Sequence, residues 1–326
     1  MTVLLGQDAA RDAFVAALQG GAMHHAWLLA GPPGVGKGTF ARLAARRLLA
    51  EGMTPGTLPP GMDVPDGHYA AQLLAAGTHP DYRELVRLPK SEKEAELQRS
   101  IKVDQVRTLL PFLGTAPSLS PRRVIVIDAA DDLERPGAGN ALLKSLEEPP
   151  AGTVFFLVSH APGRLMPTIR SRCRLLRFEA LADRDSAAVL RGAMPDADAD
   201  EVDALVRAGA GSPGRALGYA GLDLAKIDAA LAGIAGDGDA DNRRRLSLAK
   251  ALSGKAAQPR YEAFLDRVPT TIAEAAALRR GEPLRVALDA YDRARMVAAS
   301  ARALSFDQQA TVLELAGIVA RLAAPR

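Results

Sequence analysis

The sequence predicts an α/β domain built on a mostly parallel sheet, followed by an all-helical second part. Short apolar runs alternate with helical spacing in the first half, one run ends in a glycine-rich loop, and no strand pattern remains beyond about Leu181. Strands that alternate with helices are typical of a parallel sheet covered by helices on both faces. A chain of 326 residues is too long for one compact core and suits two or three domains.

Three continuous apolar runs have the length of buried strands. The predicted strands are Ala26–Ala30, Val124–Ile127 and Val154–Val158. Helical spacing follows the first strand from Thr39 to Leu49, and a second predicted helix, Asn140–Glu147, is stopped by two prolines. The order of these elements is that of strand–helix units in a parallel sheet.

The other segments have weaker patterns. Frequent proline and glycine predict an irregular insertion at about residues 51–79, and the charged run Lys90–Arg99 is typical of a solvated loop or an exposed helix surface. Ala187–Ala220 indicates two short helices, broken at Gly209–Gly214. Apolar residues recur at helical spacing over residues 222–326, which predicts a helical bundle.

The composition is that of a soluble globular protein, with 48% hydrophobic and 24% charged residues and a net charge of +3. The single cysteine, Cys173, excludes an internal disulfide framework and a cysteine-based zinc site. No run approaches the roughly 18 to 20 apolar residues of a membrane span. The N-terminal segment carries acidic and polar residues where a signal peptide needs a basic start. We therefore expect a cytoplasmic protein that does not associate with membranes.

A phosphate-binding loop follows the first predicted strand. Gly31, Gly34, Gly36 and Lys37 have Walker A spacing between a strand and a helix. The glycines let backbone N–H groups converge on phosphate oxygens, the lysine meets the β- and γ-phosphates, and the helix N-terminus adds partial positive charge. The alternative is a glycine-rich turn that merely caps a helix.

The residue after the lysine departs from this motif. It is Gly38, where a serine or threonine hydroxyl normally binds Mg²⁺. Thr39 lies one place later, and a shift of one residue turns a helical side chain by roughly 100°. We therefore expect ATP or ADP to bind weakly, with poor support from metal.

The second predicted strand ends in a carboxylate, Asp128, which gives it the form of a Walker B motif. In that motif the aspartate is directed at the nucleotide-bound metal. The alternative is that Asp128 only caps the end of the strand.

Four longer segments carry a more specific pattern. They are AAGTHPDY (Ala75–Tyr82), NALLKSLEEPP (Asn140–Pro150), LMPTIRSRC (Leu165–Cys173) and GSPGRAL (Gly211–Leu217). Together with the Walker A loop they resemble the AAA+ clamp loader subunits of bacterial DNA polymerase III. The similarity covers roughly the first two thirds of the chain, and the final third resembles the family only as a helical region.

The resemblance implies a AAA+ domain at residues 1–178, a small helical lid at 179–221 and a helical collar at 222–326 that joins a five-subunit ring. It also implies partners: other clamp loader subunits, a sliding clamp that the ring opens, and the primer-template DNA on which the clamp is placed.

The family usually has a glutamate after the Walker B aspartate, where it orients the attacking water. Here that residue is Ala129, and the loss of a positioned base costs roughly 10²- to 10⁴-fold in rate. Together with Gly38 this change predicts a subunit that does not hydrolyse ATP. The alternatives are an active AAA+ motor subunit, which would need the glutamate and a threonine directly after Lys37, and a P-loop small-molecule kinase, which would not need the SRC motif.

The resemblance assigns Arg172, within Ser171–Cys173, as an arginine finger that enters the nucleotide site of a neighbouring subunit. A guanidinium stays charged and offers several donors to phosphate oxygens, and such fingers contribute roughly 10³- to 10⁵-fold in rate. The alternative is a solvated basic surface near DNA. That surface would comprise Arg164, Arg170, Arg172, Arg174 and Arg177. The resemblance also places Ser159 at the sensor 1 position and Arg215 at the sensor 2 position, either as functional residues or as relics.

Better-known relatives carry a four-cysteine zinc module between the Walker A loop and the HPD segment. The equivalent stretch here, Gly61–His79, has no cysteine. His68 and His79 alone make a poor tetrahedral site. We therefore predict that the chain binds no zinc and has no other metal ligands of its own.

Overall fold

The computed structural model describes residues 4–21, 23–91, 97–304 and 306–323. Backbone packing divides the chain into two compact units, Met1–Arg215 and Ala216–Arg326. The first unit holds the sheet, and all described elements of the second unit are helical. The finer division, with a lid of residues 179–221 apart from a domain of residues 1–178, stays a prediction.

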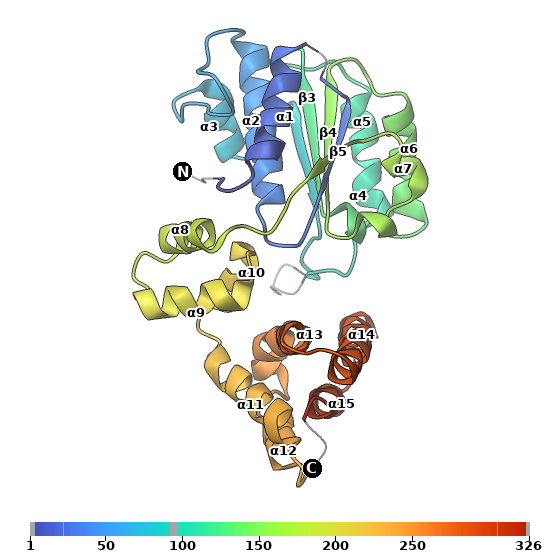
Figure 1. Ribbon diagram of the computed structural model, residues 1–326. Helices are drawn as coiled ribbons and strands as arrows, with labels where there is room; N and C mark the ends of the chain where they lie inside the picture. The colour runs from blue at the N-terminus through green and yellow to red at the C-terminus, as the bar shows by residue number, and fades with distance from the viewer. Residues whose placement is uncertain (1–3, 22, 92–96, 305, 324–326) are drawn as a thin grey trace. The chain divides into compact units, whose positions relative to one another are not determined.

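The first unit is built on five parallel strands in the order β2-β3-β4-β1-β5 (Figure 1). The three central strands are those predicted from the sequence, and almost all of their residues are buried. The two edge strands were missed because each carries two charged residues in a short run, as solvated edges commonly do. The strands are β1 (Ala26–Ala30), β2 (Tyr82–Val86), β3 (Arg123–Asp128), β4 (Thr153–Ser159) and β5 (Arg174–Arg177).

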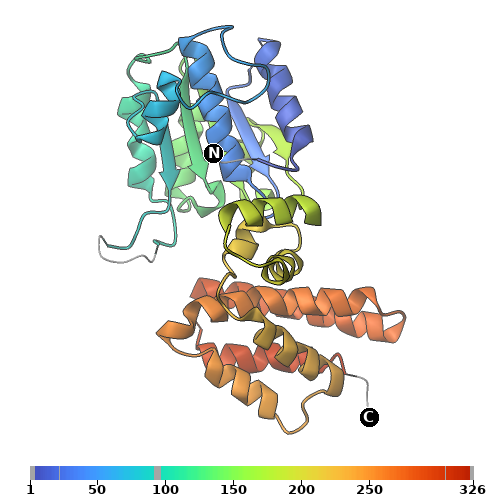
Figure 2. The same cartoon turned by 90° about the vertical axis from the view of Figure 1, so that its left-hand side faces the viewer.

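Helices cover both faces of this sheet (Figures 1 and 2). One face carries α1 (Asp8–Gln19), α2 (Lys37–Met53) and α3 (Tyr69–Ala75), and the other carries α4 (Val103–Arg107), α5 (Leu109–Leu113), α6 (Gly137–Glu147) and α7 (Pro167–Arg170). Successive strand residues point to opposite faces and so fill two separate cores. Trp27 and Phe156 pack with Phe14 and Phe40 on the first face, while Phe155 and Leu157 pack on the second.

The insertion at residues 51–79 is more regular than predicted. Helix α2 extends beyond its predicted end, and α3 lies inside the insertion. Arg47 of α2 is 7% exposed and donates to the carbonyl groups of Pro59 at 2.6 Å and Asp63 at 3.1 Å. The loop is therefore held by side chains that lie outside it, which local composition does not reveal. The charged run Lys90–Arg99 includes residues 92–96, which lie outside the described residues.

Three helices follow the sheet over the segment 183–217, where two were predicted. They are α8 (Asp183–Ala193), α9 (Ala199–Gly209) and α10 (Pro213–Leu217). Asp198 caps α9 by accepting a hydrogen bond from the backbone N–H of Glu201 at 2.7 Å. The predicted break at Gly209–Gly214 corresponds to the turn between α9 and α10, and the segment predicted as one helix before that break contains both α8 and α9.

The second unit is a helical bundle, as predicted. Its helices are α11 (Leu224–Asp237), α12 (Arg243–Ala251), α13 (Gln258–Ala277), α14 (Glu282–Leu304) and α15 (Gln308–Ala320). They share one apolar core that includes Leu231, Phe264 and Leu315, all fully buried. None of the described helices is both long and apolar enough to cross a membrane.

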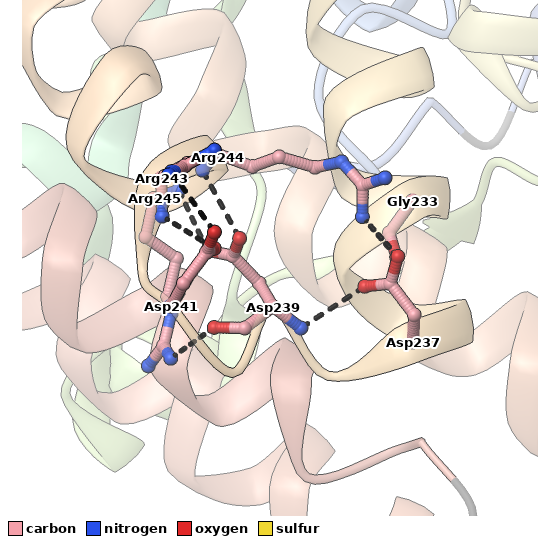
Figure 3. Close-up of polar contacts among 7 residues, drawn as sticks. All are labelled: Gly233, Asp237, Asp239, Asp241, Arg243, Arg244 and Arg245. Atoms are coloured by element: carbon pink, nitrogen blue, oxygen red, sulfur yellow. Dashed lines mark hydrogen bonds and ion pairs between the residues drawn. The ribbon is translucent and has the colours of Figure 1, made fainter.

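The turn between α11 and α12 is held by paired aspartates and arginines (Figure 3). The side chain of Asp239 is 2% exposed and accepts hydrogen bonds from the backbone N–H groups of Arg244 at 3.1 Å and Arg245 at 2.9 Å. These N–H groups belong to the first turn of α12, where a helix lacks its own acceptors. The other pairs are Arg243 with Asp241 and Arg244 with Asp237.

Candidate functional site

The P-loop leaves the carboxyl end of β1, and α2 begins at its lysine. Gly36 is the N-cap of α2 with φ of +97°, and Gly34 has φ of +75°, so both occupy a region that side chains disfavour. A Cβ atom on Gly31 would overlap the carbonyl oxygen of Phe178. Backbone conformation at Gly34 and Gly36 and close packing at Gly31 therefore account for glycine at these three positions.

Lys37 is directed at its own loop. It is 2% exposed, and its Nζ donates to the carbonyl oxygen of Gly31 at 2.7 Å and to that of Pro32. Burial lowers the pKa of Lys37 to about 8, although the carboxylates of Asp128 and Asp131 act in the opposite direction. A phosphate group would have to draw the lysine away from these two carbonyl groups.

The GSPGR segment lies directly on the P-loop. The Ser212 hydroxyl donates to the carbonyl oxygen of Pro33 at 2.7 Å, and the Gly214 N–H donates to that of Gly34 at 2.9 Å. A Cβ atom on Gly214 would lie 2.8 Å from the Cα of Gly34, which is closer than such atoms approach. Glycine at both positions therefore allows this backbone contact.

Arg215, the predicted sensor 2 residue, is bound within the same segment. Its guanidinium donates to the carbonyl oxygen of Gly209 at the end of α9, and its backbone N–H donates to the Ser212 hydroxyl at 3.4 Å. A cation at the C-terminal end of a helix is favourable to the helix dipole. In this structure Arg215 therefore stabilises the turn after α9.

Asp128 ends β3 and faces α2. Its Oδ2 atom lies 3.3 Å from Nη2 of Arg42, and a Cβ atom on Gly38 would overlap the same oxygen. The next residue, Ala129, is 4% exposed and offers no polar group. A hydroxyl ligand and a water-orienting carboxylate are thus both missing, and these donors do not fit a nucleotide-bound Mg²⁺ held in the usual P-loop manner.

Ser159, the predicted sensor 1 residue, ends β4 beside the P-loop strand and is fully buried. Its hydroxyl donates to Asp131 Oδ1 at 2.8 Å, and Asp131 Oδ2 accepts from the backbone N–H groups of His160 and Ala161. Asp131, the first acidic residue after β3, therefore fixes the end of the neighbouring strand. Asp131 lies in the 3₁₀ helix η1 (Ala130–Asp132), directly after β3.

Thr39 lies on the side of α2 that lines a cavity of about 750 Å³. Arg42 and Glu84 line the same cavity, as does Gln7 from the N-terminal segment. Gln7 is 6% exposed and donates to the carbonyl oxygens of Val35 at 3.2 Å and Glu179 at 2.9 Å. This contact joins the P-loop to the segment after β5.

Arg172 lies after α7 at the surface, with 35% of its side chain exposed. Its Nη2 pairs with Oε1 of Glu147, at the end of α6, at 2.7 Å, and its Nη1 donates to the carbonyl oxygen of Thr168 at 2.9 Å. Two contacts from different helices thus fix the guanidinium. The neighbouring Arg174 differs, because its guanidinium stacks 4.9 Å above the ring of Trp27.

The histidines considered as zinc ligands have structural partners. His68 Nδ1 accepts from the backbone N–H of Ala70 at the start of α3, and its Nε2 lies 2.9 Å from the Thr54 hydroxyl. His79 Nδ1 accepts from the backbone N–H of Asp81 at 3.1 Å. The described residues contain no group of three or more histidine, cysteine, aspartate or glutamate side chains placed to hold a metal ion.

Sequence reasoning missed Arg42, Glu84 and Glu147. Arg42 follows Gly38 by four residues, a spacing that places both on one face of α2, so helical periodicity was a usable signal. Glu84 lies on an edge strand that was not predicted. Glu147 meets Arg172 only through the packing of α6 on α7, and nothing local to either residue indicates that contact.

Comparison with known proteins agrees with these motifs. A family model described as DNA polymerase III, delta subunit, matches residues 6–182, more than half of the chain. The DNA polymerase III subunit delta' of Pseudomonas aeruginosa is 40% identical over 197 residues, which is 60% of this chain and 56% of that protein. The delta' subunit of Escherichia coli is 37% identical over 213 residues, covering 63% and 57%.

A gamma/tau subunit of DNA polymerase III from Mycobacterium tuberculosis is 34% identical over 218 residues, 64% of this chain and 34% of that protein. The chain matches little more than half the length of the two delta' relatives. The five-stranded parallel sheet with helices on both faces and the C-terminal helical bundle agree with the fold class predicted from the sequence. The chain belongs to the DNA polymerase III delta-prime family.

Proposed function

We propose that this chain is a clamp loader subunit that does not hydrolyse ATP and supplies Arg172 to the nucleotide site of a neighbouring subunit. The partners would be clamp loader subunits of the gamma/tau and delta types in a five-membered ring, which loads a sliding clamp onto primer-template DNA. Relatives named delta', gamma and tau subunits of DNA polymerase III support a place in such an assembly.

One contrast within the first unit carries the proposal. The chain's own site lacks a base after Asp128 and a hydroxyl after Lys37, whereas Arg172 is partly exposed at the surface and fixed by two contacts. An arginine held at the surface can reach a phosphate group on another subunit. A subunit that hydrolysed ATP itself would need a carboxylate where Ala129 is buried. The active motor subunit is therefore the weaker alternative.

Any ATP or ADP at Lys37 would bind weakly, because the lysine Nζ already donates to the carbonyl oxygens of Gly31 and Pro32 and would have to leave them. The structural partners of His68 and His79 support a subunit that works without zinc. We place the protein in the cytoplasm with the rest of the replication machinery.

Two measurements test the proposal. The purified chain should show no ATP turnover above background, and sustained turnover that is lost in Asp128→Asn would contradict it. In the reassembled loader, Arg172→Ala should lower ATP turnover by the partner subunits roughly 10³-fold at the site it serves. Arg170→Ala is the matched control, because Arg170 is an exposed arginine of the same surface turn. Equal effects of the two substitutions would favour a general basic surface.

A further inference from the structure

The Walker B carboxylate faces a cation of its own chain. Arg42 lies one helical turn beyond Gly38 in α2, and its Nη2 lies 3.3 Å from Oδ2 of Asp128 and 2.7 Å from Oε1 of Glu84. Its Nε donates to the same Glu84 oxygen at 2.9 Å. One guanidinium thus joins two carboxylates that come from adjacent strands, β3 and β2.

Both carboxylate oxygens of Glu84 have a partner. Its Oε2 accepts a hydrogen bond from the Tyr82 hydroxyl at 2.9 Å, while Oε1 is taken by Arg42. Tyr82 and Glu84 are two residues apart on β2 and so share the face that α2 covers. The carboxylate has a fixed position beneath α2, and Arg42 can therefore bridge it to Asp128 without a change of backbone.

Gly38 is part of the same arrangement. A Cβ atom at position 38 would overlap Asp128 Oδ2 and would lie 3.2 Å from Nη1 of Arg42. The serine or threonine that normally binds the metal at this position does not fit while Asp128 is turned toward Arg42. The glycine and the arginine are thus two parts of one departure from the usual P-loop site.

We infer that Arg42 takes the place of the divalent cation at this P-loop, so that Asp128 and Glu84 do not bind Mg²⁺. Two carboxylates this close to one another would otherwise attract a hard cation, which prefers oxygen ligands. A guanidinium provides the positive charge and several donors, and it stays protonated at any physiological pH. The inference concerns the free chain, and it holds whether or not Arg172 acts on a neighbour.

The test measures Mn²⁺ binding to the free, full-length chain by electron paramagnetic resonance. Arg42→Met keeps the length of the side chain and removes its charge, and it should bind Mn²⁺ at least about tenfold more tightly than the unaltered chain, a difference of about 1.4 kcal/mol. Adding Asp128→Asn to that variant should abolish the gain. Arg42 is half exposed and asparagine has the shape of aspartate, so neither substitution opens a cavity in the core.

Two controls define the result. Arg42→Lys keeps a positive charge and should bind as little Mn²⁺ as the unaltered chain. Arg46→Met removes an arginine one turn further along α2, which pairs with Asp66 instead, and should also change nothing. The inference is overturned if the unaltered chain binds Mn²⁺ as tightly as Arg42→Met, or if the gain persists after Asp128→Asn.

Discussion

Removal of the Asp239 carboxylate should destabilise the helical bundle more than any other exchange in the α11–α12 turn. The carboxylate caps α12 by accepting two backbone N–H hydrogen bonds, and Nε of Arg245 lies 3.3 Å from it (Figure 3). Loss of a helix cap costs about 0.5–2 kcal/mol, and a hydrogen bond to a charged group contributes about 1.5–3 kcal/mol. For Asp239→Ala we expect a loss of about 2–4 kcal/mol in the free energy of unfolding.

Differential scanning calorimetry or urea unfolding of the full chain measures this loss in the transition of the second unit. For a unit of this size the midpoint should fall by roughly 10 °C or more. Asp241→Ala is the matched control, because Asp241 is 58% exposed in its pair with Arg243 and such pairs contribute about 0–1 kcal/mol. Equal losses in the two variants would refute the assignment of Asp239 as a buried cap.

The pH dependence of the difference gives a second check. Burial acts to raise the pKa of Asp239, but hydrogen bonds from the Arg245 and Arg244 N–H groups outweigh it, so the pKa lies below its ordinary value of 3.8. A depressed native pKa stabilises the fold above the unfolded pKa, and this stabilisation is lost as pH falls through the native pKa. The difference in the free energy of unfolding between the unaltered chain and Asp239→Ala should therefore become smaller below about pH 4.

Three further predictions concern the first unit. Glu147→Gln removes the ion pair that fixes Arg172, and it should lower ATP turnover by the partner subunits in the assembled loader roughly tenfold. Glu147→Asp should partly restore this turnover. Glu148→Gln, at an exposed neighbouring residue, should leave it unchanged. Lys37→Met should raise the melting temperature at pH 7, because burial lowers the pKa of Lys37 from 10.5 to about 8 and so penalises its charged form. This rise in melting temperature should shrink as pH increases from about 8. It should vanish above about pH 10.5, where the lysine is neutral in both the folded and the unfolded chain. Arg47→Ala removes the contacts to Pro59 and Asp63, so limited proteolysis should cut residues 54–68 faster, whereas Arg83→Ala, on β2, should leave that cleavage rate unchanged.

The central strands and the P-loop could be predicted because their signals are local. Continuous apolar runs identify β1, β3 and β4, and Walker A spacing identifies Lys37 whatever surrounds it. The edge strands escaped because charged residues interrupt their apolar pattern. Helix α3 escaped because the proline and glycine around it dominate the local composition.

The contacts at the site were harder to predict than its residues. Ser159 and Arg215 were predicted from their positions in motifs, but the motifs did not indicate their partners, Asp131 on another element and Gly209 at the end of α9. The pairs of Arg42 with Glu84 and of Arg172 with Glu147 join residues that are 42 and 25 positions apart, so only the fold brings them together. The pairs of interacting residues at such a site can be assigned from sequence only when one motif contains both partners.

The most direct test compares two altered chains in the same reassembled loader by following ATP hydrolysis in a single turnover. One chain carries Lys37→Ala with Asp128→Asn, which disables its own nucleotide site, and the other carries Arg172→Ala. The account predicts near-normal hydrolysis with the first chain and a loss of roughly 10³-fold at one partner site with the second. A large loss with the first chain and none with the second would contradict it.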